Sequence, residues 1–146
     1  MALTAEMKTK IENRLRPVGV WMIGALLVQI VVGMANNLWL DIPQSGGNDA
    51  WSSAAPMILL QSHLWVGTAL TVFGTWLPID AIRVKNRQWT IVSLIGVVLI
   101  GAAFGGGSAF LTSGGSDDAS SFMMAISCVL ALAVYLVPFL RKAKAA

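Results

Sequence analysis

The residue best suited to chemistry in this sequence is its single histidine, His63. It lies within an apolar stretch, residues 56–78, that is long enough to cross a membrane. An ionisable side chain is costly to place there, which makes it a candidate for function. On a helical wheel His63 shares a face with Gly67 and Gly74, which allow close approach of another helix. The sequence therefore predicts a buried histidine on the inward face of a transmembrane helix.

Four other polar residues are expected to lie near this histidine. Gln29 and Asn36 share one stripe of residues 18–40, while Ser108 and Ser120 fall at a similar depth in the two later apolar stretches. Lipid offers amides and hydroxyls no hydrogen-bond partner, so these side chains should face the other helices. The sequence predicts a polar cluster of Gln29, Asn36, His63, Ser108 and Ser120.

Haem b is the cofactor that such a cluster could bind, with His63 as an axial ligand. Buried histidines on glycine-lined helix faces hold the iron of membrane b-type cytochromes. Because the chain has one histidine, the second ligand would be Met124 or the His63 of a second copy across a symmetric dimer. A methionine on a helix face is more often a packing residue than a ligand, so haem binding is the alternative interpretation.

No residues form a recognisable catalytic or metal site. The apolar stretches contain no carboxylate and no lysine, and no nucleophile is paired with a base. Cys128 is the single cysteine, so an intramolecular disulfide and a Cys-x-x-Cys site are excluded, and it is interpreted as a packing residue. The sequence predicts no catalytic residue and no metal ligand, and it favours a role other than that of an enzyme.

The elements that must carry these residues are four transmembrane helices. Of 146 residues, 56% are hydrophobic and 12% are charged, about half the charged fraction of a soluble domain. The apolar residues gather at 18–40, 56–78, 89–111 and 119–140, each close to the ~20 residues that cross a bilayer. We therefore expect an all-α, polytopic integral membrane protein, an antiparallel up-down bundle with a leader at 1–16, a membrane domain at 17–141 and a tail at 142–146.

The charges predict the orientation of this bundle. All ten basic residues lie in the leader, in the loop between the second and third stretches, or in the tail. The other two loops carry Asp41, Asp49, Asp117 and Asp118 instead. By the positive-inside rule both termini are cytoplasmic, N-in and C-in. This asymmetry explains the basic composition without a nucleic-acid partner.

Several residues suggest where the helices begin, end and touch. Pro17 suits the first turn of the first helix, Pro138 should close the last, and Asp117 or Asp118 should cap the N-terminus of the last. Gly101-x-x-x-Gly105 predicts a surface of small residues for close helix packing, although the Gly105–Gly107 run could equally mark a kink. An apolar stripe in the leader could also dock on the membrane surface.

Four segments carry a resemblance to a known group of proteins: GMANNLW, SHLWVGTAL, GGGSAFL and DDASSFMMA, in this order and spacing. The chain resembles uncharacterised small four-helix membrane proteins of actinobacteria and related bacteria. The resemblance spans about residues 30–130 and implies the fold and a location in the bacterial cytoplasmic membrane. Similar proteins often have further histidines in the first outer loop, and QSGGNDAWSSA has none, which argues against a metal site here.

Three functional hypotheses follow. The leading one is a small accessory or interaction protein that packs in the bilayer against a second copy or a larger membrane complex, supported by the small-residue surfaces. The first alternative is haem-based electron transfer through His63 and Met124. The second alternative is an oligomeric transporter or channel, in which His63 could titrate. Lipid, quinone or metal handling remain open as well.

Overall fold

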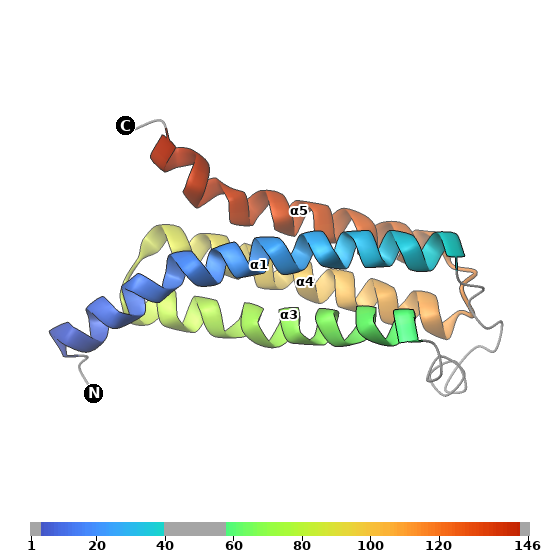
Figure 1. The fold of residues 1–146 in the computed structure, drawn as a ribbon, viewed down its shortest axis with the longest axis horizontal. Coiled ribbons are helices and arrows are strands. Elements are labelled where there is room, and N and C mark those ends of the chain that lie inside the picture. The colour runs from blue at the N-terminus through green and yellow to red at the C-terminus, as the bar shows by residue number, and fades with distance from the viewer. Residues whose placement is uncertain (1–3, 40–57, 144–146) are drawn as a thin grey trace.

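A computed structural model describes residues 4–39 and 58–143 (Figure 1). The expected outer loop with Asp41 and Asp49, and the end of the tail with Lys144, lie outside the described residues. The described chain forms four helices, α1 (Ala5–Trp39), α3 (Ile58–Arg83), α4 (Arg87–Thr112) and α5 (Asp118–Ala143). Each is long and apolar enough to cross a membrane. The prediction of an all-α protein with four transmembrane helices is therefore confirmed at this level.

The helix boundaries differ from the predicted ones at three prolines. Pro17, Pro78 and Pro138 were expected at or near helix ends, but all three lie inside helices. α1 begins at Ala5 and runs on through Pro17, so residues 5–16 of the predicted leader are helical and continuous with the first predicted span. Proline removes one backbone donor, yet tertiary packing can hold a helix on both sides of it. Here Pro78 and Pro138 are buried against neighbouring helices, and Leu15, before Pro17, is 1% exposed.

Each helix packs against two others, α1 against α3 and α5, and α4 against α3 and α5. The start of α1, the α3–α4 turn and the C-terminal part of α5 lie at one end of the bundle (Figure 1). We call this the basic end, because it carries Lys8, Arg14, Arg83 and Arg87.

Large apolar side chains cover the outside of the bundle. Trp21, Trp65, Trp76 and Phe122 are each more than 60% exposed. On α3 the exposed face includes Trp65, Ala69, Val72 and Trp76, which lie opposite His63 on a helical wheel. A soluble protein rarely exposes apolar patches of more than a few hundred Å². Such a surface is suited to a hydrocarbon environment.

The densest core lies toward the basic end. Tyr135 and Ser93 are fully buried, and Trp89 packs edge-on against Phe139 with ring centroids 6.0 Å apart. Gly96 leaves the space that the Tyr135 ring fills, since an added Cβ would lie 2.6 Å from the phenol Cζ. This packing closes the basic half of the bundle.

The glycine contacts differ from the prediction for Gly101-x-x-x-Gly105. Both of these glycines are exposed, and nothing lies within 4 Å of a Cβ added at either one. The close approach of α4 and α5 occurs instead at Gly106, where a Cβ would lie 2.9 Å from the backbone oxygen of Ser120. Gly101 and Gly105 share one side of α4, as the helical wheel predicts. α4 contacts α5 through a neighbouring side, which carries Gly106.

A tight turn joins α4 to α5 and aligns their ends. Gly114 and Gly115 have positive φ angles of 68° and 76°, and the Gly115 amide donates to the Phe110 carbonyl. Asp117 then caps α5, because its carboxylate accepts hydrogen bonds from the backbone amides of Ala119 and Ser120. Of the two aspartates predicted as the cap, Asp117 fills the role.

Candidate functional site

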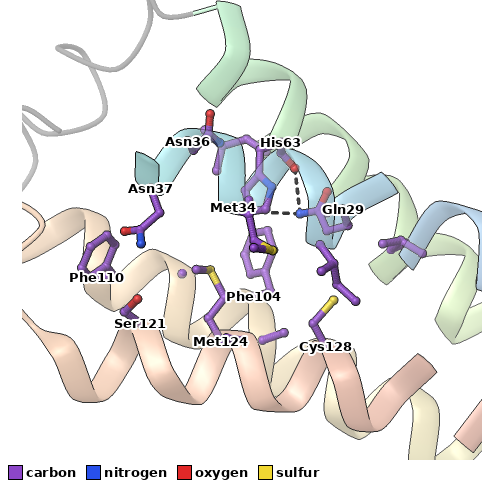
Figure 2. Close-up of a pocket in the computed structure, with 18 of the residues that line it drawn as sticks. Gln29, Met34, Asn36, Asn37, His63, Phe104, Phe110, Ser121, Met124 and Cys128 are labelled. Atoms are coloured by element: carbon purple, nitrogen blue, oxygen red, sulfur yellow. Dashed lines mark hydrogen bonds between the residues drawn. The ribbon is translucent and has the colours of Figure 1, made fainter. Parts of the chain in front are cut away.

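A cavity of about 340 Å³ lies at the end of the bundle opposite the basic end. All four helices line it, through the last turns of α1 and α4 and the first turns of α3 and α5 (Figure 2). Most of its wall is apolar, including Leu26, Leu60 and Ile100. The polar side chains of its wall are Gln29, Asn36, Asn37, His63, Ser108 and Ser121. A largely apolar hollow with a few polar groups is the usual form of a small-molecule site.

Gln29 and His63 form a defined pair between α1 and α3. The Gln29 side-chain nitrogen lies 3.0 Å from the His63 backbone oxygen and 3.2 Å from the ring Nε2 (Figure 2). A carbonyl oxygen can only accept, so the Gln29 atom is the amide nitrogen, whose second hydrogen points to the ring. The ring Nε2 therefore accepts, and the proton of the neutral imidazole is on Nδ1.

Two glycines make room for this pair. A Cβ at Gly33 would lie 2.9 Å from Cε1 of the His63 ring, so the ring rests directly on the α1 backbone. A Cβ at Gly67 would lie 3.1 Å from the Gln29 side-chain nitrogen. Each polar side chain thus crosses to the opposite helix at a glycine. The helix crossing could not be this close with larger residues at either position.

The polar part of the cavity contains unpaired hydrogen-bonding atoms. His63 Nδ1, Gln29 Oε1 and both side-chain atoms of Asn36 are buried without a partner in the described part of the chain. Asn36 is only 6% exposed. A buried polar atom without a partner costs about 1–3 kcal/mol, so proteins seldom keep several together. Four such atoms belong to residues of this cavity wall, and a fifth, the Tyr135 hydroxyl, is buried in the packed core.

Sulfur and aromatic side chains form another part of the wall. Met34, Phe104, Met124 and Cys128 line the cavity, and Met34, Phe104 and Met124 face one another across it in Figure 2. The Met124 sulfur lies over Gly107, where an added Cβ would be 3.0 Å from it. Methionine side chains adapt their shape and make favourable contacts with rings.

The cavity is open to the outside of the bundle. Five residues of its wall, Met34, Asn37, Phe104, Ala125 and Val129, are also exposed on the outer surface. Four of the five are apolar, so most of this border suits access from lipid.

The predicted site residues have different positions relative to this cavity. Gln29, Asn36, His63, Ser108 and Met124 all line it. Ser120 does not, because its hydroxyl donates to the Asp117 carboxylate in the cap of α5, and the next residue, Ser121, lines the cavity in its place. His63 was expected to be buried, but its side chain is only partly buried, since it borders the cavity. Asn37 and Phe104 were not predicted from the sequence, although Asn37 is part of the NNLW segment and Phe104 directly precedes the Gly-rich run.

These side chains do not fit a haem iron well. Haem ligation needs a free imidazole nitrogen, and Nε2 of His63 already accepts a hydrogen bond from Gln29. Among the described residues, no three histidine, cysteine or acidic side chains come together as a metal site. The polar side chains of the cavity wall are neutral hydrogen-bond donors and acceptors.

Comparisons with models of known protein families, with curated proteins and with solved structures find no match for this chain. The function of the chain is therefore inferred from the geometry of the cavity.

Proposed function

We propose that this chain is an integral membrane binding protein whose cavity holds a small, uncharged amphipathic molecule taken from the bilayer. The observation that supports this most strongly is the group of buried, unpaired atoms of Gln29, Asn36 and His63 beside an apolar hollow of about 340 Å³. A ligand with a polar head and an apolar body would pair those atoms and fill the hollow. The role is non-enzymatic, as an accessory protein of the membrane.

The proposal includes an orientation in the bacterial cytoplasmic membrane. With the basic end in the cytoplasm, as the positive-inside rule requires, the helices form an antiparallel up-down bundle with both termini inside. The cavity then lies in the outer half of the bilayer. Its opening beside Met34 and Val129 would face the outer leaflet.

Transport is less well supported than binding. The cavity lies in one half of the bundle, and the other half is filled by a core that includes Met22, Leu77 and Tyr135, none of them more than 3% exposed. Within the described residues the spanning helices offer no acidic side chain along a path between the two ends. Because the other half of the bundle is closed, the cavity is better suited to holding a ligand than to passing it across the membrane.

The first experiment asks whether a small molecule accompanies the protein. Protein purified from membranes in mild detergent is extracted with organic solvent, and the apolar compounds are quantified per chain by mass spectrometry. Gly107→Leu should lower the ligand content, because its side chain enters the cavity against only the flexible Met124 thioether. Gly24→Leu is the matched control, since nothing lies within 4 Å of a Cβ at that position and it lies outside the cavity wall. Equal extracts from all three proteins would contradict the proposal.

Haem binding remains the alternative to be tested by absorption. Protein from haem-replete cells should show no Soret band and no sharp reduced bands on adding dithionite. A haem spectrum that His63→Ala abolishes would replace the present proposal. Such a result would also require Gln29 to release Nε2 of the ring.

The expected partner, a second copy or a larger membrane complex, also stays a proposal. It is supported by Gly101 and Gly105, which leave an open small-residue surface on the outside of α4. Helices associate in membranes through surfaces of this kind. Gly101→Leu should then weaken self-association in a cross-linking assay and leave the fold intact.

A further inference from the structure

We infer that the molecule bound in this cavity is a quinone or quinol, a neutral ring carrying oxygen substituents and an apolar tail. This inference rests on the proposed function and names the ligand class of the same site. Three features of the cavity carry it: the lack of charge in its wall, the kind of atoms left unpaired, and the sulfur and aromatic side chains of the wall.

The cavity wall contains no charged residue among those described. The lining side chains include amides, hydroxyls and one imidazole, but no aspartate, glutamate, lysine or arginine. The Gln29 contact leaves the imidazole in its neutral form. A charged head group would be desolvated there without a counter-charge, which is strongly unfavourable. Phospholipids and fatty-acid anions are therefore poor ligands, and a neutral head group is selected.

The unpaired atoms include both donors and acceptors. With the proton on Nδ1, His63 offers a donor, and the Asn36 amide nitrogen offers a second. Gln29 Oε1 and Asn36 Oδ1 are acceptors. A quinone carbonyl accepts from the two donors, and a quinol hydroxyl donates to the two acceptors. These atoms are covered in the structure, so their side chains must turn toward the hollow for the same four atoms to pair with either form of one ring.

The sulfur and aromatic part of the wall suits a flat ring rather than a simple chain. Met34, Phe104 and Met124 face one another across the hollow (Figure 2). Thioether sulfurs and aromatic rings both contact ring ligands favourably. The opening beside exposed Met34, Ala125 and Val129 leaves a route for an apolar tail to extend into lipid. Ring, oxygen atoms and tail each have a matching part of the cavity.

The probe is decylubiquinone, a benzoquinone with a saturated tail, titrated into the full chain in mild detergent. The readout is the nuclear magnetic resonance of isotope-labelled methionine methyl groups, in which Met34 and Met124 are assigned through their leucine variants. A ring between them should shift both signals saturably, at one quinone per chain. Decanol, which has the same tail and one hydroxyl but no ring, should bind at least about tenfold more weakly.

The key variant is Asn36→Leu, which removes two of the unpaired atoms at nearly constant volume. It should weaken quinone binding about tenfold, as expected for the loss of the buried hydrogen bond that the Asn36 amide nitrogen donates to the ring carbonyl. It should also raise the melting temperature of the ligand-free protein, because a buried unpaired amide is replaced by an apolar group. Ser62→Ala is the control, since this exposed hydroxyl precedes His63 but is outside the cavity wall.

The other outcomes separate this inference from the proposed function. If decanol and decylubiquinone bind equally well, the quinone assignment is overturned while a general amphiphile site survives. If neither compound shifts the methionine signals saturably, both the inference and the proposed function are overturned. If Asn36→Leu binds quinone as well as the unaltered chain does, the polar wall does not recognise the ring, and the inference is overturned.

Discussion

The side-chain amide of Gln29 donates to two acceptors of His63 at once, the backbone oxygen at 3.0 Å and the ring Nε2 at 3.2 Å. Because one amide nitrogen serves both atoms, the ring is oriented relative to its own backbone as well as to α1. The pair therefore sets which imidazole nitrogen carries the proton and directs the other ring nitrogen to the polar part of the cavity.

Gln29→Leu should release the His63 ring from this tautomer. The chain has one histidine, so nitrogen resonances of labelled imidazole report on it alone. We expect a signal typical of the Nδ1–H form in the unaltered protein and a mixture of both neutral tautomers in the variant. Gln61→Leu, which alters a glutamine of α3 outside the cavity wall, should keep the original signal. A mixture already present in the unaltered protein would contradict the hydrogen-bond assignment.

Gly33→Ala should disturb the site, whereas Gly24→Ala in the same helix should not. The added methyl at Gly33 would lie 2.9 Å from the His63 ring, so the ring must move and its bond to Gln29 is lost. We expect a loss of about 1 kcal/mol in unfolding free energy and altered histidine resonances. At Gly24 nothing lies within 4 Å, and alanine favours the helix, so stability should be unchanged or slightly higher. Equal effects at the two positions would rule out the ring contact.

Gly96→Ala tests the packing of the basic half. A Cβ there would overlap the ring and hydroxyl of Tyr135, which is fully buried and cannot move aside. Overpacking of this kind costs about 1–3 kcal/mol. Thermal unfolding followed by circular dichroism in one detergent should show the loss, and Gly105→Ala, at an open position of the same helix, should show none. A fully stable Gly96→Ala protein would mean that α4 and α5 are farther apart than described.

Asp117 should make the stability of α5 dependent on pH. The Ser120 hydroxyl, and then the Ser120 and Ala119 amides, hold the pKa of the Asp117 carboxyl below its usual range. The folded state thus favours the charged form, so this stabilisation is present at neutral pH and is lost as the pH falls through the lowered pKa.

Two substitutions separate the charge of Asp117 from its capping role. Asp117→Ala should lower the melting temperature at neutral pH by a few degrees, while Asp117→Asn keeps a good cap and should change it little. Any advantage of aspartate over asparagine should vanish in acid. Asp118→Asn is the control, because it removes the same formal charge one residue later. A gap between aspartate and asparagine that widens in acid would contradict the assigned sign.

The sequence by itself determined the class of protein and the inward and outward faces of its helices. Four apolar stretches of about 20 residues imply four spanning helices, because a bilayer leaves backbone groups no other partner. Helical periodicity likewise placed Gln29 and Asn36 inward and Trp65 and Trp76 outward, since side chains of one face recur at fixed spacing. These features depend on the chain and the bilayer alone, and the described helices agree with them.

Tertiary structure decided which of several similar residues make each contact. Neighbouring residues differ by about 100° around a helix, so the depth and rotation of α5 decide that Ser121 lines the cavity while Ser120 binds Asp117. In the same way, the rotation of α4 about its axis places Gly106, not Gly105, in contact with α5. The pairing of Gln29 with His63, and the unpaired atoms around it, exist only once α1 and α3 cross at Gly33 and Gly67. No local pattern in the chain specifies that crossing, because it depends on how all four helices pack together.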